Sequence, residues 1–371
     1  MATDLRCGEV FATRYRVERL LRSGGMGTLY VASHVTTGRR VALKLMRPEI
    51  VNDVGARSRF AQEAMVASLI DSSGVVDVID AGIEEGRAVP FLVMELLTGR
   101  DLAEELSVQH AATGLSGLPA QQVCDWIRQT AQALDRAHDK GIVHRDLKPE
   151  NLFLAERHDE PPRIKILDFG IAKILSAASS RSTIAGGTPL YMAPEQTKRG
   201  EVTPAADIWA LGLIAYTLLV GTPYWEGESV HELYGEILGG DYPSAVARAR
   251  RREVELPPTF DAWFFRCVDH NPERRFRTAS QASLELSAVF GASRSSTAQT
   301  EAHGTLVWTP AARAIKGDGD GDHAGRRLPE LASHELMSAQ ATAPWTTSER
   351  RTSTLGAQVQ QTVPVVAPPS Q

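Results

Sequence analysis

The densest group of residues able to do chemistry lies between His144 and Asn151, where most side chains are charged or able to bind a metal. Asp146 offers a proton acceptor, Lys148 a cation for phosphate, and Asn151 an amide oxygen for a metal ion. These are the groups that transfer of a phosphoryl group requires. A solvated loop also carries such charges, so this segment alone leaves both interpretations open.

A further acidic group follows a short apolar segment. Residues 164–167 (Ile-Lys-Ile-Leu) have the composition of a strand, and Asp168, Phe169 and Gly170 come directly after them. This order places a carboxylate at the end of a strand, beside a glycine that lets the chain pivot. Mg²⁺ prefers one or two carboxylate or amide oxygens together with the phosphates of a substrate. Asp168 and Asn151 are therefore the candidate metal ligands.

Lys44 is the charged residue within the apolar segment 41–45. Burial of an unpaired ammonium group costs several kcal/mol, so a buried Lys44 needs an anionic partner. Glu63 is the candidate, because it lies in the segment 57–70, whose apolar spacing predicts a helix. The alternative is that Lys44 extends to the surface and keeps its charge in water.

A glycine-rich segment, Leu21 to Tyr30, lies between two extended apolar stretches. Glycines are common in hairpin turns because they tolerate positive φ. Glycines also remove side chains, so that backbone N–H groups can close over phosphates. Short glycine motifs have many false positives, and both interpretations stay open on this segment alone.

The elements that must position these groups change in kind along the chain. Residues 15–97 contain extended apolar segments with one predicted helix, whereas the later segments show apolar residues at helical spacing. This predicts an α+β protein with a small β-rich part joined by a hinge to a larger helical part. The segments with helical spacing are 120–138, 207–220, 229–238, 259–269 and 278–290.

Composition excludes several classes of protein. The formal net charge of −5 offers no basic surface for nucleic acid. The three cysteines, at positions 7, 124 and 267, have no metal-binding spacing and predict reduced thiols. The apolar run 208–220 is shorter than the ~20 residues needed to span a membrane. Because residues 1–14 also lack the apolar core of a secretory signal, we expect a cytoplasmic protein without a membrane span.

In their order along the chain, these segments resemble the motifs of the protein kinase superfamily, specifically the bacterial eukaryotic-like (Hanks-type) serine/threonine kinases. The resemblance covers about residues 15–290. The matching motifs are Gly24-Gly25-Met26-Gly27, Val41-Ala42-Leu43-Lys44, Glu63, Val93-Met94-Glu95, His144 to Asn151, Asp168-Phe169-Gly170, Gly187 to Glu195, Asp207-Ile208-Trp209 and Arg275.

The resemblance implies a bilobal protein-kinase-like fold within residues 15–290. A β-rich N-lobe of about 15–94 and a hinge at 95–100 would precede a helical C-lobe at 101–290. Residues 291–371 are rich in Ser, Thr, Ala, Gln and Pro, and we expect a disordered tail because they bury too little apolar surface. That tail is either an autophosphorylated docking segment or an inert linker.

The resemblance also implies an activity, with ATP and Mg²⁺ as cofactors. Such a kinase transfers the γ-phosphoryl group of Mg-ATP to Ser or Thr hydroxyls of protein substrates. Lys148, two residues after Asp146, and Thr188 are typical of serine/threonine kinases rather than tyrosine kinases. Two alternatives are a pseudokinase scaffold, which would lack Lys44, Asp146 or Asp168, and a small-molecule phosphotransferase, which would lack the 187–195 segment.

Roles of single residues follow from the resemblance. Asp146 is the implied catalytic base, Lys148 the implied cation on the transferring phosphoryl group, and Asn151 and Asp168 the implied metal ligands. Glu195 and Arg275 would form a structural ion pair. The implied nucleotide-binding residues are Leu21, Arg22, Gly24, Gly25, Met26, Gly27, Leu29, Ala42, Lys44, Glu63, Glu95, Leu97, Asp101 and Phe153.

Arg145 before Asp146 suggests regulation by phosphorylation, because an arginine there gains a strong anionic partner only when a phosphate arrives. We expect autophosphorylation at Ser180, Ser182 or Thr183, through a transient homodimer in which one copy modifies another. The alternative is that this serine-rich segment is only a polar, mobile loop.

The sequence departs from the family pattern at four places. After the predicted 57–70 helix, residues 71–74 (Asp-Ser-Ser-Gly) replace a usual His-Pro pair. Arg22 stands where the first glycine of the glycine loop is usual, and an arginine there predicts an altered affinity for ATP rather than inactivity. Residues 107–118 are expected to be a surface insertion. Residues 159–162 are expected to be an extended turn between two strands.

Overall fold

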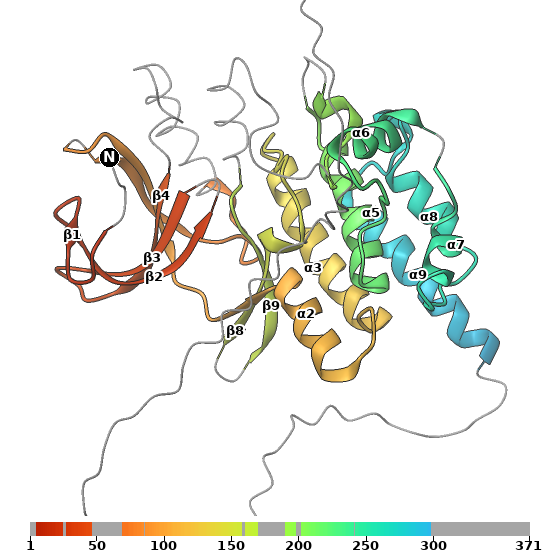
Figure 1. Cartoon of the computed structure of the whole chain (residues 1–371), viewed down its shortest axis with the longest axis horizontal. Coiled ribbons are helices and arrows are strands. Elements are labelled where there is room, and N and C mark those ends of the chain that lie inside the picture. The colour runs from red at the N-terminus through yellow and green to blue at the C-terminus, as the bar shows by residue number, and fades with distance from the viewer. Residues whose placement is uncertain are drawn as a thin grey trace, which may run out of the picture. The chain divides into compact units, whose positions relative to one another are not determined.

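The computed structural model of the chain describes residues 5–24, 27–46, 69–84, 86–157, 160–169, 190–197, 202–240 and 242–297 (Figure 1). Several predicted positions lie outside these residues. They are Gly25, Met26, Glu63 with its expected helix, Gly170, the phosphorylation-site candidates Ser180, Ser182 and Thr183, residues 187–189 with Thr188, and the chain after 297.

The N-terminal lobe is built on an antiparallel sheet with the strand order β1-β2-β3-β4-β6-β5. Side chains alternate between the faces of a strand, so the odd residues 41, 43 and 45 pack in one apolar cluster and Ala42 and Met46 pack in another. Lys44 lies on the face of Ala42. The strands are β1 (Val10–Phe11), β2 (Tyr15–Gly24), β3 (Gly27–His34), β4 (Arg40–Met46), β5 (Val78–Glu84) and β6 (Val89–Glu95).

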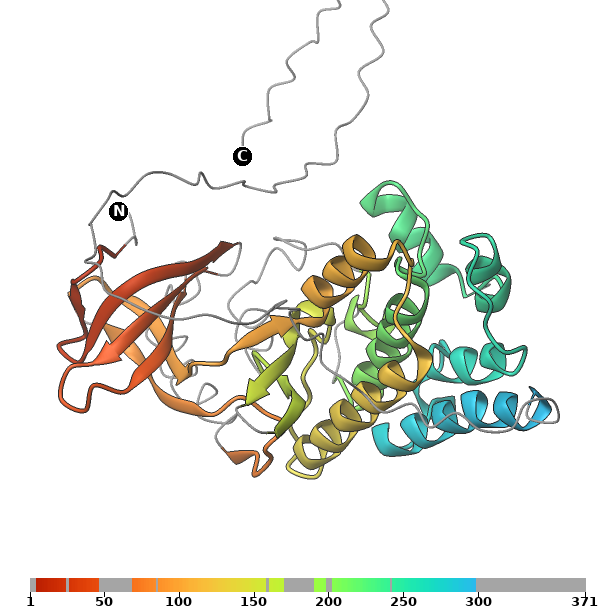
Figure 2. The same cartoon turned by 90° about the horizontal axis from the view of Figure 1, so that it is seen from below.

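A smaller sheet of three strands, β7 (Gly99–Asp101), β8 (Leu152–Arg157) and β9 (Glu160–Ile166), joins this lobe to the helices. The expected turn at 159–162 was wrong, because β9 already begins at Glu160 and contains Pro161 and Pro162. Proline is tolerated there since β9 is an edge strand of the sheet. Figure 2 shows this sheet between the N-terminal strands and the helices.

The helical lobe is centred on α5 (Ala205–Val220), which is buried along almost its whole length and confirms the expected buried helix. A Cβ on Gly212 would lie 2.5 Å from the Cβ of Cys267, so glycine allows α5 and α8 to touch. Helices α3 and α9 lie side by side, and Asp135 of α3 accepts hydrogen bonds from the first backbone N–H groups of α9 (Figure 2). The other helices are α2 (Leu102–Thr113), α3 (Ala120–His138), α6 (Val230–Gly239), α7 (Ala245–Arg250), α8 (Phe260–Cys267) and α9 (Ala279–Thr297), with single turns at Pro149–Asn151, Pro194–Thr197 and Pro272–Arg274.

The architecture confirms an α+β, bilobal fold and corrects some boundaries. Residues 107–113, expected to be an inserted surface segment, continue helix α2. Helix α9 ends at Thr297 rather than near 290, and β1 lies before residue 15. Within the described residues, no helix is long and apolar enough to cross a membrane.

Candidate active site

The segment from His144 to Asn151 folds into a loop that gathers its polar side chains around Asp146. The Nζ of Lys148 lies 3.2 Å from Oδ2 of Asp146. The side-chain N–H₂ of Asn151 donates to the backbone carbonyl of Asp146 at 2.7 Å and to its Oδ2 at 3.3 Å. These bonds fix the amide of Asn151 so that its oxygen remains available as a metal ligand.

Asp207 of α5 holds the start of this loop. One oxygen of its buried carboxylate accepts the backbone N–H of His144 at 2.8 Å, and the other accepts that of Arg145 at 2.9 Å. Arg145 has a φ of 70°, which is uncommon for a residue with a side chain. The two hydrogen bonds therefore stabilise a backbone conformation that the loop would not adopt alone.

Asp207 remains ionised in its buried position. Burial acts to raise the pKa of this carboxyl, but the hydrogen bond and charge of His138, 2.8 Å away, outweigh burial and hold the pKa below its ordinary value. Asp207 is thus an anionic anchor for the loop that carries Asp146.

Asp168 follows β9 and meets Lys44 of β4. The Nζ of Lys44 lies 2.6 Å from Oδ2 of Asp168, so the described partner of Lys44 is this carboxylate, while Glu63 lies outside the described residues. Asp168 has a φ of 59°. Burial acts to raise its pKa, but the charge and hydrogen bond of Lys44 lower it, as do the nearby His144 and Lys148. Asp168 is therefore held as a carboxylate, the form that binds a metal ion.

These contacts connect the four predicted catalytic and metal-binding residues with Lys44, a predicted nucleotide-binding residue. Lys44 touches Asp168, whose pKa is lowered by the charge of Lys148, and Lys148 touches Asp146, which is bonded to Asn151. Residues from β4, from the 144–151 loop (named the catalytic loop below, after its predicted role) and from the end of β9 thus meet at one place. Oxygen ligands for Mg²⁺ and cations for phosphate are both present there. Among the described residues, no cluster of three or more His, Cys, Asp or Glu side chains forms a separate metal site.

His144 contacts the residues directly before and after Asp168. Its Nε2 lies 2.8 Å from the carbonyl oxygen of Leu167, and its ring meets the ring of Phe169 edge to face at 4.7 Å. The buried histidine therefore positions the residues on both sides of Asp168.

The glycine-rich segment pairs as the hairpin interpretation requires, with Gly24 at the end of β2 opposite Gly27 at the start of β3. Gly27 has a φ of 148°, and a Cβ there would lie 2.0 Å from the carbonyl oxygen of Leu45. Only glycine lets β3 pass this close to β4. Leu29 pairs with Lys44 across these two strands, so the start of β3 lies beside Lys44 in the sheet.

Arg22, the departure from the family pattern, contacts another predicted nucleotide-binding residue. Its Nη1 lies 3.3 Å from Oδ2 of Asp101, and the Asp101 side chain is almost fully buried while that of Arg22 is mostly exposed. The other oxygen of Asp101 accepts the backbone N–H of Glu104 and caps helix α2. Arg22 therefore joins the glycine-rich hairpin to the start of the helical lobe.

The segment expected to hold adenine lies between β6 and β7. Leu97 is half-buried there, and Ala42 on β4 pairs with Met94 on β6. The backbone N–H of Glu95 already donates to Asp77 at 3.0 Å, so only its carbonyl oxygen could meet a base. On the smaller sheet, Phe153 is half-buried and pairs with Asp101.

Lys165 also acts at this hinge, although the sequence did not single it out. It is 3% exposed, and its Nζ contacts the carboxylate of Glu95 and, at 3.3 Å, the carbonyl of Val75. A buried lysine within β9 thus connects the two sheets.

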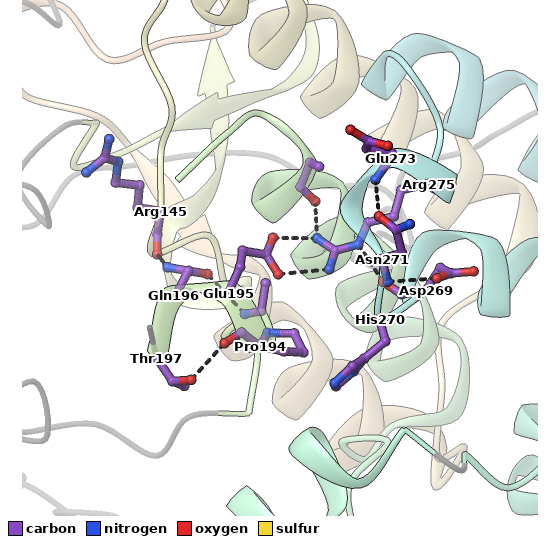
Figure 3. A network of polar contacts seen from close by, with 12 residues as sticks. Arg145, Pro194, Glu195, Gln196, Thr197, Asp269, His270, Asn271, Glu273 and Arg275 are labelled. Atoms are coloured by element: carbon purple, nitrogen blue, oxygen red, sulfur yellow. Dashed lines mark hydrogen bonds and ion pairs between the residues drawn. The ribbon is translucent and has the colours of Figure 1, made fainter. Parts of the chain in front are cut away.

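A network of polar contacts extends from the catalytic loop into the helical lobe (Figure 3). The guanidinium of Arg275, fully buried, forms two parallel bonds with the carboxylate of Glu195, at 2.7 and 2.9 Å. It also donates to the carbonyls of Ala205 and Asp269, each at 2.8 Å. This arrangement is the structural ion pair that the family resemblance implied for Glu195 and Arg275.

Gln196, next to Glu195, is a residue that the sequence reasoning missed. Its side-chain N–H₂ donates to the carbonyl of Arg145 at 2.7 Å, and its Oε1 accepts the backbone N–H of Ala193 at 3.0 Å (Figure 3). One neutral side chain therefore connects the 193–197 turn with the catalytic loop. No charge or periodicity marks such a residue in a sequence.

Comparisons with known proteins agree on one family. Residues 15–285 match the family described as "Protein kinase domain". Serine/threonine-protein kinase pkn3 of Myxococcus xanthus is 32% identical over 348 residues, which are 92% of this chain and 62% of that protein. Serine/threonine-protein kinase Pkn1 of the same organism is 41% identical over 219 residues, 58% of this chain and 29% of that protein. The chain thus spans less than two thirds of the length of either relative.

Solved structures agree with this match. The crystal structure of the Mycobacterium tuberculosis PknI kinase domain superposes with a TM-score of 0.61 at 26% identity. The superposition covers 78% of this chain and 100% of that one.

Proposed function

Because the chain belongs to the protein kinase family, we propose that it is an active serine/threonine protein kinase that transfers the γ-phosphoryl group of ATP to Ser or Thr hydroxyls of proteins. The observation that carries this proposal is the connected group of Lys44, Asp168, Lys148 and Asp146. A pseudokinase scaffold would lack one of these residues or hold it elsewhere.

Each residue of the group has a proposed task. The carboxylate of Asp146 accepts the hydrogen bond of the substrate hydroxyl, orients its oxygen toward the γ-phosphorus, and takes its proton as the new P–O bond forms. The bond between that phosphorus and the β,γ-bridging oxygen breaks, and ADP carries away its electron pair. Lys148 stabilises the charge on the transferring group, where fixed charges lower the barrier most.

The nucleotide and its metal ion have proposed positions as well. Lys44 binds phosphate oxygens, the glycine-rich hairpin covers them, and Ala42 and Phe153 enclose the adenine ring. Asn151 and Asp168 would hold Mg²⁺, which neutralises phosphate charge when it is bound. The preference for Ser and Thr rests on Lys148 and Thr188. We place the protein in the cytoplasm.

Activation by autophosphorylation has one supporting observation. The Nε of Arg145 is buried and has no hydrogen-bond partner among the described residues. A buried guanidinium nitrogen normally finds an acceptor. A phosphate on Ser180, Ser182 or Thr183 would supply it, with two copies meeting transiently for the transfer.

Incubation of the full chain with Mg-[γ-³²P]ATP and a protein substrate tests the activity. We expect label on serine or threonine, and its loss in Asp146→Asn, which keeps the side-chain shape but cannot accept the proton. Equal labelling by the variant would contradict the role of Asp146, and no labelling by the native chain would contradict the proposed function. Replacing Ser180, Ser182 and Thr183 together by alanine should lower activity, and an unchanged rate would refute their role in activation.

A further inference from the structure

A polar cavity of about 400 Å³ opens on the chain between the 71–74 segment, helix α3 and strand β9. Its lining contains none of the predicted catalytic, metal or nucleotide-binding residues. A volume of this size is at the lower end of the range that ligand-binding sites occupy. Because the lining is dominated by polar side chains, the cavity suits a charged or hydrogen-bonding ligand.

Hydrogen bonds within the wall determine which groups are left for a ligand. The Oε1 of Gln129 accepts the backbone N–H of Ile164 at 3.0 Å, which leaves the N–H₂ group of Gln129 as a donor. The Oγ of Ser72 accepts the backbone N–H of Gly74 at 3.2 Å, which leaves its hydroxyl hydrogen free to donate. The fold thus uses one acceptor lone pair on each of these two side chains, and their donors remain.

Two arginines add positive charge to these donors. Arg136 of α3 has no ion pair or hydrogen bond within the described part of the chain, and Arg163 of β9 has only a distant contact with Glu160, 3.9 Å from Nε to Oε2. Guanidinium groups bind phosphate and carboxylate with two parallel bonds, and they are stronger partners for these anions than neutral donors. The cavity therefore offers two guanidinium groups together with an amide and a hydroxyl donor.

We propose that this cavity binds the phosphoryl group of a phosphoserine or phosphothreonine side chain. A phosphate monoester presents three acceptor oxygens and a charge of about −1.5 to −2, which matches several convergent donors better than a carboxylate with two oxygens does. The choice of a phosphorylated side chain over another anion rests on the proposed function, because the proposed reaction makes such side chains.

Strand β9 connects the cavity to the candidate active site. Ile164 lines it, and two residues later Ile166 donates to the carbonyl of Gly74 and accepts the N–H of Val76. Asp168 lies two residues after Ile166, just past the end of β9. A ligand held between the 71–74 segment and β9 would therefore brace the strand that delivers the metal-binding carboxylate.

Asp71 is the acidic side chain in the lining, and its replacement tests whether the ligand carries a negative charge. Its carboxylate repels a phosphate dianion. Replacing it with Asn should therefore strengthen binding, whereas replacing the arginines should weaken it. A cavity built for a cation would show the opposite pattern.

The test is calorimetric titration of the full chain with an alanine-rich peptide that carries one phosphoserine and no basic residue. We expect saturable binding of the phosphopeptide and no binding of the unphosphorylated peptide. The double variant Arg136→Ala/Arg163→Ala should bind the phosphopeptide about tenfold more weakly or worse. The Asp71→Asn variant should bind it more tightly. Arg128→Ala is the matched control, because Arg128 lies on α3, pairs with Asp125 at 3.4 Å and does not line the cavity. It should leave the affinity unchanged.

A second titration uses inorganic phosphate in place of the phosphopeptide. Binding of free phosphate as tight as that of the phosphopeptide would mean that the cavity holds the ion alone and would overturn the proposed ligand. The proposed site would be wrong if neither the phosphopeptide nor free phosphate binds. It would also be wrong if the double arginine variant binds the phosphopeptide as tightly as the native chain does. Because both arginines are exposed, the variants should fold, which a native melting temperature and a native rate of phosphoryl transfer would verify. If the phosphopeptide does not bind while phosphoryl transfer is normal, this proposal is wrong and the proposed function is unaffected.

Discussion

The side-chain amide of Gln196 donates a hydrogen bond to the backbone carbonyl of Arg145, with 2.7 Å between Nε2 and the oxygen. Arg145 precedes Asp146 and has a φ of 70°. Its two peptide groups are held from two directions, since Asp207 binds its N–H and Gln196 binds its carbonyl. The position of Asp146 therefore depends on the turn at 193–197 as well as on helix α5.

We expect Gln196→Ala to lower kcat with little change in the KM for ATP, because the hydrogen bond orients Asp146 and lies away from the nucleotide. A net hydrogen bond of about 1 kcal/mol corresponds to a loss of about fivefold. Steady-state kinetics with varied ATP measures both constants. Gln281→Ala serves as the control, since its amide donates to Glu285 within helix α9 and makes no hydrogen bond to the 144–151 loop. An unchanged kcat in Gln196→Ala would mean that Gln196 does not position the loop.

Arg22→Gly should lower the KM for ATP. Arg22 contacts Asp101, which resembles a ribose-binding residue, so the arginine and the nucleotide compete for one carboxylate. The effect should be a few-fold, because the arginine is largely exposed and such pairs are weak. Arg100→Ala is a matched control, since Arg100 is next to Asp101 in sequence but pairs with Glu105. If Arg22→Gly and Arg100→Ala have equal ATP constants, the contact with Asp101 does not influence nucleotide binding.

Lys44→Met should reduce kcat by about 10²-fold or more, since it removes a charge from the site where phosphate charge must be stabilised. It also removes the cation that holds the pKa of Asp168 low, while burial, which raises that pKa, persists. We therefore expect the activity that remains to require a higher pH than in the native chain. A pH–rate profile measures this, and a profile of unchanged shape would contradict the coupling between Lys44 and Asp168.

The carboxyls of Asp168 and Asp207 predict a loss of stability in acid. Their pKa values in the folded chain lie below the ordinary value of about 3.9. A carboxyl with a depressed folded pKa contributes stability that is present above its unfolded pKa and is lost as pH falls through the folded pKa. The free energy of unfolding, measured in urea, should therefore fall as the pH decreases below about 4. The difference between the native chain and Asp207→Asn should shrink over the same range, and a difference independent of pH would contradict this assignment.

Lys44 shows which part of the site could be predicted from the sequence and which part could not. Its place in an apolar strand predicted that it needs an anionic partner, and the partner that the structure describes is Asp168, 124 positions away. Local spacing identifies a buried charge, but only the meeting of β4 with the end of β9 decides which carboxylate reaches it. Gln196 and Lys165 escaped prediction for the same reason, because their partners are brought close by the packing of distant elements.

The boundaries of α2 could have been predicted. Comparison with the family pattern suggested a surface insertion at residues 107–118. However, Asp101 is an N-cap whose side chain accepts the N–H of Glu104, and Gly114 ends the helix with a φ of 71°. An aspartate and a glycine at these positions are the usual start and stop signals of a helix. The weak apolar pattern between them concealed the helix, because only Leu102 is buried.

Arg275→Ala should reduce the free energy of unfolding by about 3–5 kcal/mol, because it leaves the carboxylate of Glu195 without the charge that compensates its burial. Arg275→Lys should also destabilise the chain, since an ammonium group cannot form the two parallel bonds or donate to the carbonyls of Ala205 and Asp269. The Arg275 guanidinium lies 4.9 Å from the ring of Trp209, so unfolding in urea followed by tryptophan fluorescence includes a reporter in this region. Arg250→Ala is the control, because its pair with Glu255 is exposed and should contribute under about 1 kcal/mol. If Arg275→Ala were no more destabilising than Arg250→Ala, the buried pair would not stabilise the helical lobe.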